Sequence, residues 1–187
     1  MALEYAAIIR DTLSAADGGN AATYQANYEA FALKVEALSE AVRTASDTIA
    51  SEKRQLLTYH DAYAYFAKEY GWTVIGAIQP SSFDEPTAKE VADLIDQVKQ
   101  TGVSAVFGSE VFPSTVLEQI GNETGVRYVD VLRDDDLLGG PGDPEHSWLG
   151  LMRFNYVTMV EALGGDASAL KSIDVSDVGP DTAVYPQ

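Results

Sequence analysis

Residues 55–78 read QLLTYHDAYAYFAKEYGWTVIGAI, and this stretch decides the fold of the 187-residue chain. It contains a strand candidate at 55–59, a helix candidate at 61–70 and a second strand candidate at 72–78. A helix between two strands is typical of a parallel crossover, because parallel strands cannot be joined by a tight turn. The stretch therefore predicts a parallel β-α-β unit.

The same alternation continues towards the carboxyl end of the chain. Further strands are predicted at 103–107 and 126–132, and further helices at 87–100, 113–123 and 145–163. The last of these helices is apolar around most of its circumference, so we expect it to be well buried. The sequence therefore predicts an α/β fold, in which a four-stranded parallel sheet is flanked by helices.

Two helices are predicted before this sheet. A short amphipathic helix at 3–16 stops at Asp17-Gly18-Gly19, and a long helix follows from Asn20. Apolar residues recur in the long helix at spacings of four and three, as in a coiled coil or a helical bundle. About 28 residues make a rod of roughly 40 Å, which is also long enough to be a spine that reaches beyond the domain. We predict a helical extension over 1–50, an α/β lobe over 51–165 and a loosely ordered tail over 166–187.

The composition restricts the classes of function. The chain carries 29 acidic and 12 basic residues, for a formal charge of −17, and it has no cysteine. The lack of cysteine excludes disulfides, thiolate metal sites and thiol nucleophiles, and the acidic balance argues against binding of nucleic acid. It favours a cation as the small partner, although excess acid is also a common adaptation for solubility. No segment is long and apolar enough to insert into a membrane, and residues 1–10 lack the pattern of a signal peptide.

Open α/β sheets bind ligands at the carboxyl ends of their strands, so the loops there are the candidate site. His60 follows the first predicted strand, Glu110 follows the third, and Asp134, Asp135 and Asp136 follow the fourth. Imidazole and carboxylate together suit zinc or manganese. We also expect a helix to begin next to His60, where the helix dipole disfavours the imidazolium form. A capping histidine and a solvated acidic turn are the alternatives.

Other chemistries have weaker support. The sequence has no G-x-S-x-G elbow, no G-x-x-x-x-G-K-[ST] phosphate loop and no G-x-G-x-x-G dinucleotide turn. His146 is interpreted as a surface or capping residue at the start of the last helix, and Tyr65 and Phe66 as the buried face of their helix. Two alternatives to a binding module stay open. One is a metal-assisted hydrolase with Asp61 or Glu110 as general base, and the other is a helical assembly module that binds no ligand.

Two segments carry a resemblance to a known family, the zinc- and manganese-binding solute-binding proteins of bacterial ABC transporters. The segment LTYHDAYAYFA at 57–67 is similar to the region around the family's third metal ligand, which is histidine in zinc-type members. The segment VLRDDDL at 131–137, followed by SWLGLMRFN at 147–155, resembles the region around the fourth ligand, an aspartate. The resemblance implies His60 and Asp135 as ligands of zinc, or alternatively of manganese. Asp134 and Asp136 are the other registers, and Glu110 is a further candidate.

The resemblance covers about residues 3–165 and extends to only one of the family's two lobes. It matches the carboxyl-terminal lobe and the long helix that joins the lobes, whereas the other lobe normally supplies two histidines. We therefore expect half of a metal site, in a piece of a longer protein or a naturally shortened one. The family implies an extracytoplasmic location, delivery of metal to an ABC permease, and no enzymatic activity.

The missing lobe would leave apolar side chains of the amino-terminal helices uncovered. These side chains include Ile8, Ile9, Tyr24, Tyr28 and Phe31. Contiguous exposed apolar surface favours association. We therefore predict a homodimer that forms through the amino-terminal helices.

Overall fold

A computed structural model describes residues 1–79, 87–109 and 114–179 of the chain. Its four parallel strands lie in the order β2-β1-β3-β4. The strands are β1 (Gln55–His60), β2 (Thr73–Gln79), β3 (Ala105–Ser109) and β4 (Arg127–Leu132). The α/β fold with a four-stranded parallel sheet is therefore confirmed.

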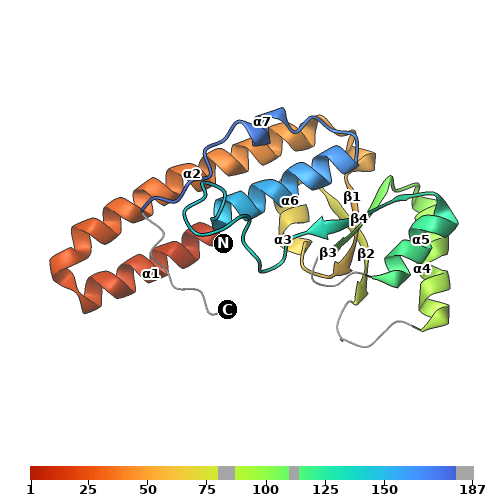
Figure 1. Cartoon of the computed structure of the whole chain (residues 1–187), viewed down its shortest axis with the longest axis horizontal. Helices are drawn as coiled ribbons and strands as arrows, with labels where there is room; N and C mark the ends of the chain where they lie inside the picture. Colours follow the sequence, from red (N-terminus) through yellow and green to blue (C-terminus); the bar gives the residue numbers. More distant parts are fainter. Residues whose placement is uncertain (80–86, 110–113, 180–187) are drawn as a thin grey trace.

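Helices cover both faces of the sheet (Figure 1). One face carries α2, α3, α6 and α7, and the other carries α4 and α5. Successive strand residues point to opposite faces, so Leu56 and Phe107 pack with the first group of helices, while Leu57 and Val106 pack with the second. The helix bounds are α2 (Ala21–Asp47), α3 (Ala64–Tyr70), α4 (Ala88–Thr101), α5 (Thr115–Thr124), α6 (Trp148–Ala162) and α7 (Ser168–Lys171).

Local sequence signals explain where α4 begins and ends. The Thr87 hydroxyl accepts a hydrogen bond from the Glu90 amide, and the Glu90 carboxylate accepts one from the Thr87 amide. This reciprocal capping box satisfies amides that the first turn leaves without helical partners. Gly102 ends the helix at φ +66°, a backbone conformation that glycine adopts without steric cost.

The amino-terminal helices project away from the sheet as a hairpin (Figure 1). It consists of α1 (Ala2–Ala16), the short 3₁₀ helix η1 (Gly18–Asn20) and the first half of α2. The buried residues of α2 all lie in its second half, from Leu38 to Ser46, and α1 has none. A second short 3₁₀ helix, η2 (Ser51–Lys53), leads from α2 into β1. The long helix predicted from the spacing of apolar residues is therefore present, and its fully buried residues lie in its second half, while Phe31 of the first half packs partly buried against the core.

The region predicted as a loosely ordered tail differs from that expectation over residues 166–179. Leu170 and Val175 are buried against the core, and Lys34 of α2 donates hydrogen bonds to the Asp174 carboxylate and to the carbonyl oxygen of Ser176. One turn of helix, α7, is too short to produce a periodic sequence pattern. The segment is instead fixed by individual side chains, which the sequence does not reveal. Residues 180–187 lie outside the described part of the chain.

Across the described ranges, no helix combines the length and the apolar character that crossing a bilayer requires.

Candidate metal-binding site

The strand order creates a crevice between β1 and β3. From β1 the chain continues to β2 at one edge of the sheet, and from β3 it continues to β4 at the other edge. Connections that diverge in this way leave an opening at the carboxyl ends of the two central strands, which is where open α/β sheets bind ligands. His60 is the last residue of β1 and Ser109 is the last residue of β3. The fold therefore opens next to His60.

A small hollow of about 20 Å³ lies at this point, with room for roughly one water-sized sphere. We call it the His60 hollow. The residues that line it include Thr58, His60, Tyr63, Gly108, Ser109 and Asp134. His60 at the end of β1 and Asp134 after β4 therefore line the same hollow.

His60 itself is held differently from the sequence-based expectation. α3 begins only at Ala64, with Tyr63 as its N-cap residue, so the helix does not start beside His60. Local interactions position the residue instead. The buried Thr58 hydroxyl donates a 2.7 Å hydrogen bond to the His60 carbonyl oxygen, and the Tyr59 ring meets the imidazole edge-on at 4.7 Å between centroids. The expected effect of the α3 dipole on His60 therefore has no structural basis.

The three aspartates occupy the loop that follows β4, and all three are exposed. Asp134 lines the His60 hollow, whereas Asp135 and Asp136 are not among its lining residues. The backbone just before them is fixed by Asn155 of α6. The Arg133 amide donates to Asn155 Oδ1 at 2.8 Å, and Asn155 Nδ2 donates to the Arg133 carbonyl oxygen at 2.7 Å. Asp134 therefore directly follows a residue whose backbone is held by two hydrogen bonds.

The other candidate residues lie apart from this pair. Asp61 is exposed and is not among the residues that line the His60 hollow, and Glu110 lies outside the described residues. His146 precedes the Ser147 N-cap of α6 and is not part of the helix. Its Nδ1 lies 3.0 Å from the carbonyl oxygen of Leu138. Within the described ranges, no group of three or more histidine, aspartate or glutamate side chains is arranged to hold a metal ion.

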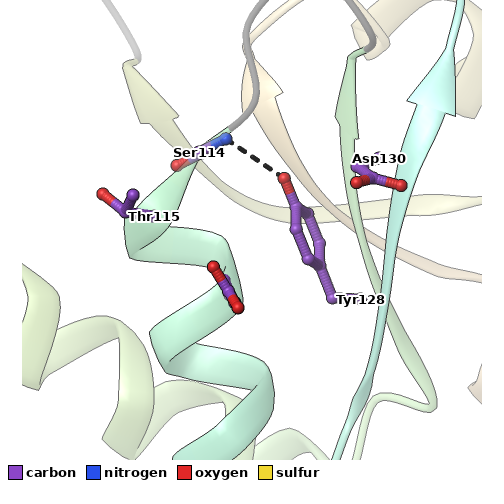
Figure 2. A pocket seen from close by; sticks show the side chains of 5 residues that line it. Ser114, Thr115, Tyr128 and Asp130 are labelled. Atoms are coloured by element: carbon purple, nitrogen blue, oxygen red, sulfur yellow. Dashed lines mark hydrogen bonds between the residues drawn. The ribbon is translucent and has the colours of Figure 1, made fainter.

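A second hollow, of about 250 Å³, is lined by Ser114, Thr115, Glu118, Tyr128 and Asp130. Figure 2 shows the Tyr128 hydroxyl pointing at the start of α5, where it accepts a 3.1 Å hydrogen bond from the Ser114 amide. Burial raises the pKa of Tyr128. Gly108 lines the His60 hollow, and a methyl group at this position would lie 2.9 Å from the Tyr128 oxygen, so a side chain there would require Tyr128 to move.

Aromatic side chains support the His60 hollow from the side of α3. Phe66 lies between Tyr63, Trp72 and Tyr156, with ring centroids 5.1–6.3 Å apart, and burial raises the pKa of Tyr156. Phe66 is thus on the packed face of α3 as predicted. Tyr65 is 69% exposed, because the short helix turns it away from the core, so its predicted burial was wrong.

Sequence reasoning did not detect the side chains that hold the backbone of this site. Thr58 and Asn155 are both buried. Thr58 bonds to the carbonyl oxygen of His60, and Asn155 bonds to the backbone of Arg133, which precedes Asp134. An asparagine inside a helix that is apolar on most sides is the one signal that could have pointed to this role.

The chain is similar in sequence and in fold to known metal-binding proteins. A family model described as "Zinc-uptake complex component A periplasmic" (ZnuA) matches residues 1–162. The manganese-binding lipoprotein MntA of Halalkalibacterium halodurans is 28% identical over 161 residues, which is 86% of this chain and 53% of MntA. The iron-binding protein YfeA of Yersinia pestis is 29% identical over 163 residues, which is 87% of this chain and 52% of YfeA.

A solved structure gives the same picture of the fold. The manganese-bound periplasmic metal binding protein from Candidatus Liberibacter asiaticus superimposes with a TM-score of 0.75 at 25% identity, over 87% of this chain and 59% of that one. The chain thus spans about half the length of the curated relatives that it matches.

Proposed function

The chain belongs to the family of the periplasmic zinc-uptake component ZnuA, and from this membership we propose that it binds a divalent metal ion for uptake. It acts as the carboxyl-terminal lobe and connecting helix of a substrate-binding protein that works outside the cytoplasm and delivers the ion to an ABC permease. The ion is cargo, and the chain catalyses no reaction. The observation that carries the proposal is that His60 and Asp134 line one hollow at the divergence of β1 and β3.

In this proposal, the described part of the chain supplies half of the metal site. A histidine and an aspartate give two ligands, whereas zinc sites normally use three or four protein ligands. The described residues include no third His, Asp or Glu in a position to complete the set. The remaining ligands therefore come from outside these residues, as in the two-lobed family members. We expect the chain alone to bind metal weakly.

Zinc is the proposed cargo and manganese is the alternative. A neutral imidazole with a carboxylate suits both ions. The names of the relatives include manganese and iron as well as zinc, so the choice of ion depends on the complete ligand set rather than on His60 alone.

The aspartate ligand is proposed to be Asp135, with Asp134 and Asp136 as the other registers. The resemblance of residues 131–137 to the family's fourth-ligand segment supports Asp135. The lining of the His60 hollow supports Asp134.

Zinc titration into the chain and its variants tests this proposal. We expect His60→Ala to abolish measurable binding, and one of Asp134→Asn and Asp135→Asn to weaken it strongly. Asp136→Asn tests the remaining register, and Asp61→Asn is the matched control, because it removes a nearby carboxylate that does not line the His60 hollow. Equal binding by the wild-type chain and by His60→Ala would remove the claim for this site.

We further propose that the chain forms a homodimer through α1. The face of α1 turned to α2 carries mainly small residues, whereas Tyr5, Ile8, Ile9 and Leu13 are between 42% and 64% exposed. A second copy that presents the same apolar face would cover them. Sedimentation equilibrium at micromolar concentration should give the mass of a dimer, and Ile8→Asp should shift it to the monomer. Tyr65→Asp changes an exposed aromatic residue elsewhere, so it should leave the dimer intact. A monomeric wild-type chain would contradict the proposal.

A further inference from the structure

Asn155 is a buried polar residue in an otherwise apolar stretch of α6. Its side chain is 5% exposed, and the neighbouring turns contribute Leu151 and Met159 to the buried face. An amide in such surroundings loses its bonds to water, so it is stable there only when its own donors and acceptor find partners. In this chain both partners belong to a single residue, Arg133.

The two hydrogen bonds form a closed pair. Asn155 Oδ1 accepts from the Arg133 amide at 2.8 Å, and Nδ2 donates to the Arg133 carbonyl oxygen at 2.7 Å. In an extended residue both backbone groups point to the same side, so one planar amide can bind them together. The Asn155 side chain thus bonds to Arg133 in the way that a peptide group of a neighbouring strand would. It does so one residue beyond the end of β4 at Leu132.

This pair determines where the aspartate loop begins. Bonding to both groups of Arg133 fixes its backbone, and Asp134 follows directly. Residues 134–136 are exposed, so Arg133 is the last point before the aspartates at which the buried part of the fold restrains the chain. The restraint comes from a helix residue 22 positions further along the chain.

We propose that Asn155 is a positioning residue, which fixes the start of the aspartate segment 134–136 beside the His60 hollow by clamping the Arg133 backbone. The inference rests on the proposed function, because it concerns the geometry of the same metal site. Ligands that are fixed before the ion arrives lose less conformational entropy on binding. Residues that orient ligands typically contribute 10- to 100-fold to metal affinity. We expect an effect of at least about tenfold here.

Asn155→Leu is the principal variant, because leucine has a similar shape and can make neither hydrogen bond. Asn155→Asp is the second variant. It keeps an acceptor for the Arg133 amide and loses the donor to the Arg133 carbonyl oxygen, so it tests the clamp if the leucine variant does not fold. The matched control is Ser46→Ala, which removes a buried hydrogen bond to Trp72 Nε1 near the opposite edge of the sheet.

The first measurement needs no metal. Amide hydrogen exchange in the metal-free chain should be faster at Arg133 in Asn155→Leu than in the wild type, and unchanged there in Ser46→Ala. Unchanged exchange at Arg133 in both Asn155 variants would overturn the clamp, even if the wild-type chain proves not to bind zinc. Failure of the proposed function and failure of this inference are thus separable.

The second measurement is the zinc affinity, with the metal ion alone as the probe. Asn155→Leu should bind at least about tenfold more weakly than the wild type, and Ser46→Ala should bind equally well. In a chain that already lacks the aspartate ligand, Asn155→Leu should have little further effect, because it acts through that aspartate. An undiminished effect in that background, or an equal loss in Ser46→Ala, would show general destabilisation and would overturn the inference.

Discussion

Gly150 lies in the first turn of α6 at a point where the structure has no room for a side chain. A Cβ atom there would overlap the carbonyl oxygen of Glu145 and lie 2.9 Å from its carbon atom, closer than such atoms approach in proteins. The obstacle is backbone, so it cannot turn aside as a flexible side chain would. We expect Gly150→Ala to displace the turn 143–147 from the start of α6.

The size of the effect follows from the bonds that this turn makes. Overpacking of a buried position costs about 1–3 kcal/mol. The Glu145 carbonyl oxygen also accepts a 2.8 Å hydrogen bond from the Ser147 amide, and losing it adds about 1 kcal/mol. The higher helix propensity of alanine compared with glycine offsets about 1 kcal/mol of this loss of stability. The free energy of unfolding should therefore fall by about 1–3 kcal/mol.

Urea unfolding followed by far-ultraviolet circular dichroism measures this change. Gly18→Ala is the matched control, because a methyl group at that position meets no atom within 4 Å. The control should stay within about 0.5 kcal/mol of the wild type. If Gly150→Ala were as stable as the wild type or more stable, the close approach of Glu145 to α6 would be refuted.

Three further changes test other contacts. Ser46→Ala leaves the buried Trp72 indole N–H without its 2.9 Å acceptor and should lower the free energy of unfolding by about 1–3 kcal/mol in urea titrations. Thr58→Val removes the donor to the His60 carbonyl oxygen and should weaken zinc binding in the same titration that tests His60→Ala, whereas unchanged affinity would show that Thr58 does not position His60. The pKa of Asp174 is lowered by Lys34 and by hydrogen bonds from Ser176, so its contribution to stability is present above the unfolded pKa of about 3.9 and is lost as the pH falls below it. Lys34→Met should therefore destabilise the chain more at pH 7 than near pH 2, because the ion pair weakens as the pH falls while the hydrogen bond to the Ser176 carbonyl oxygen does not depend on pH. A loss that is equal at both pH values would contradict this explanation.

The architecture could be predicted because its signals are local and repeated. Strands and helices alternate from Gln55 onward, and parallel strands with helical crossovers follow from that alternation. The positions of His60 and the aspartates after the first and fourth strands were sufficient to place them at one edge of the sheet. Neither step required knowledge of contacts between distant residues.

Features that depend on distant contacts were missed. The sequence predicted a helix beginning at 61, but α3 starts at Ala64, and His60 is held by Thr58 rather than by a helix end. Leu170 is buried by contacts with a core formed earlier in the chain. Tyr65 and Phe66 are adjacent in a helix of seven residues, and only the tertiary packing decides which one is buried.

The identity of the aspartate ligand shows the same limit at the scale of one side chain. Asp134, Asp135 and Asp136 have the same chemistry, so composition and spacing cannot distinguish them. They differ in how far along the chain they lie from Arg133. Asn155 bonds to both the amide and the carbonyl oxygen of that residue. A carboxylate adjacent to this fixed point has fewer conformations to lose on binding than one that is two residues further away. The clamp therefore favours the first two aspartates over Asp136. If zinc binding instead depended on Asp136 alone, the loop would have to rearrange around the metal, and the Asn155 clamp would not determine the geometry of the site.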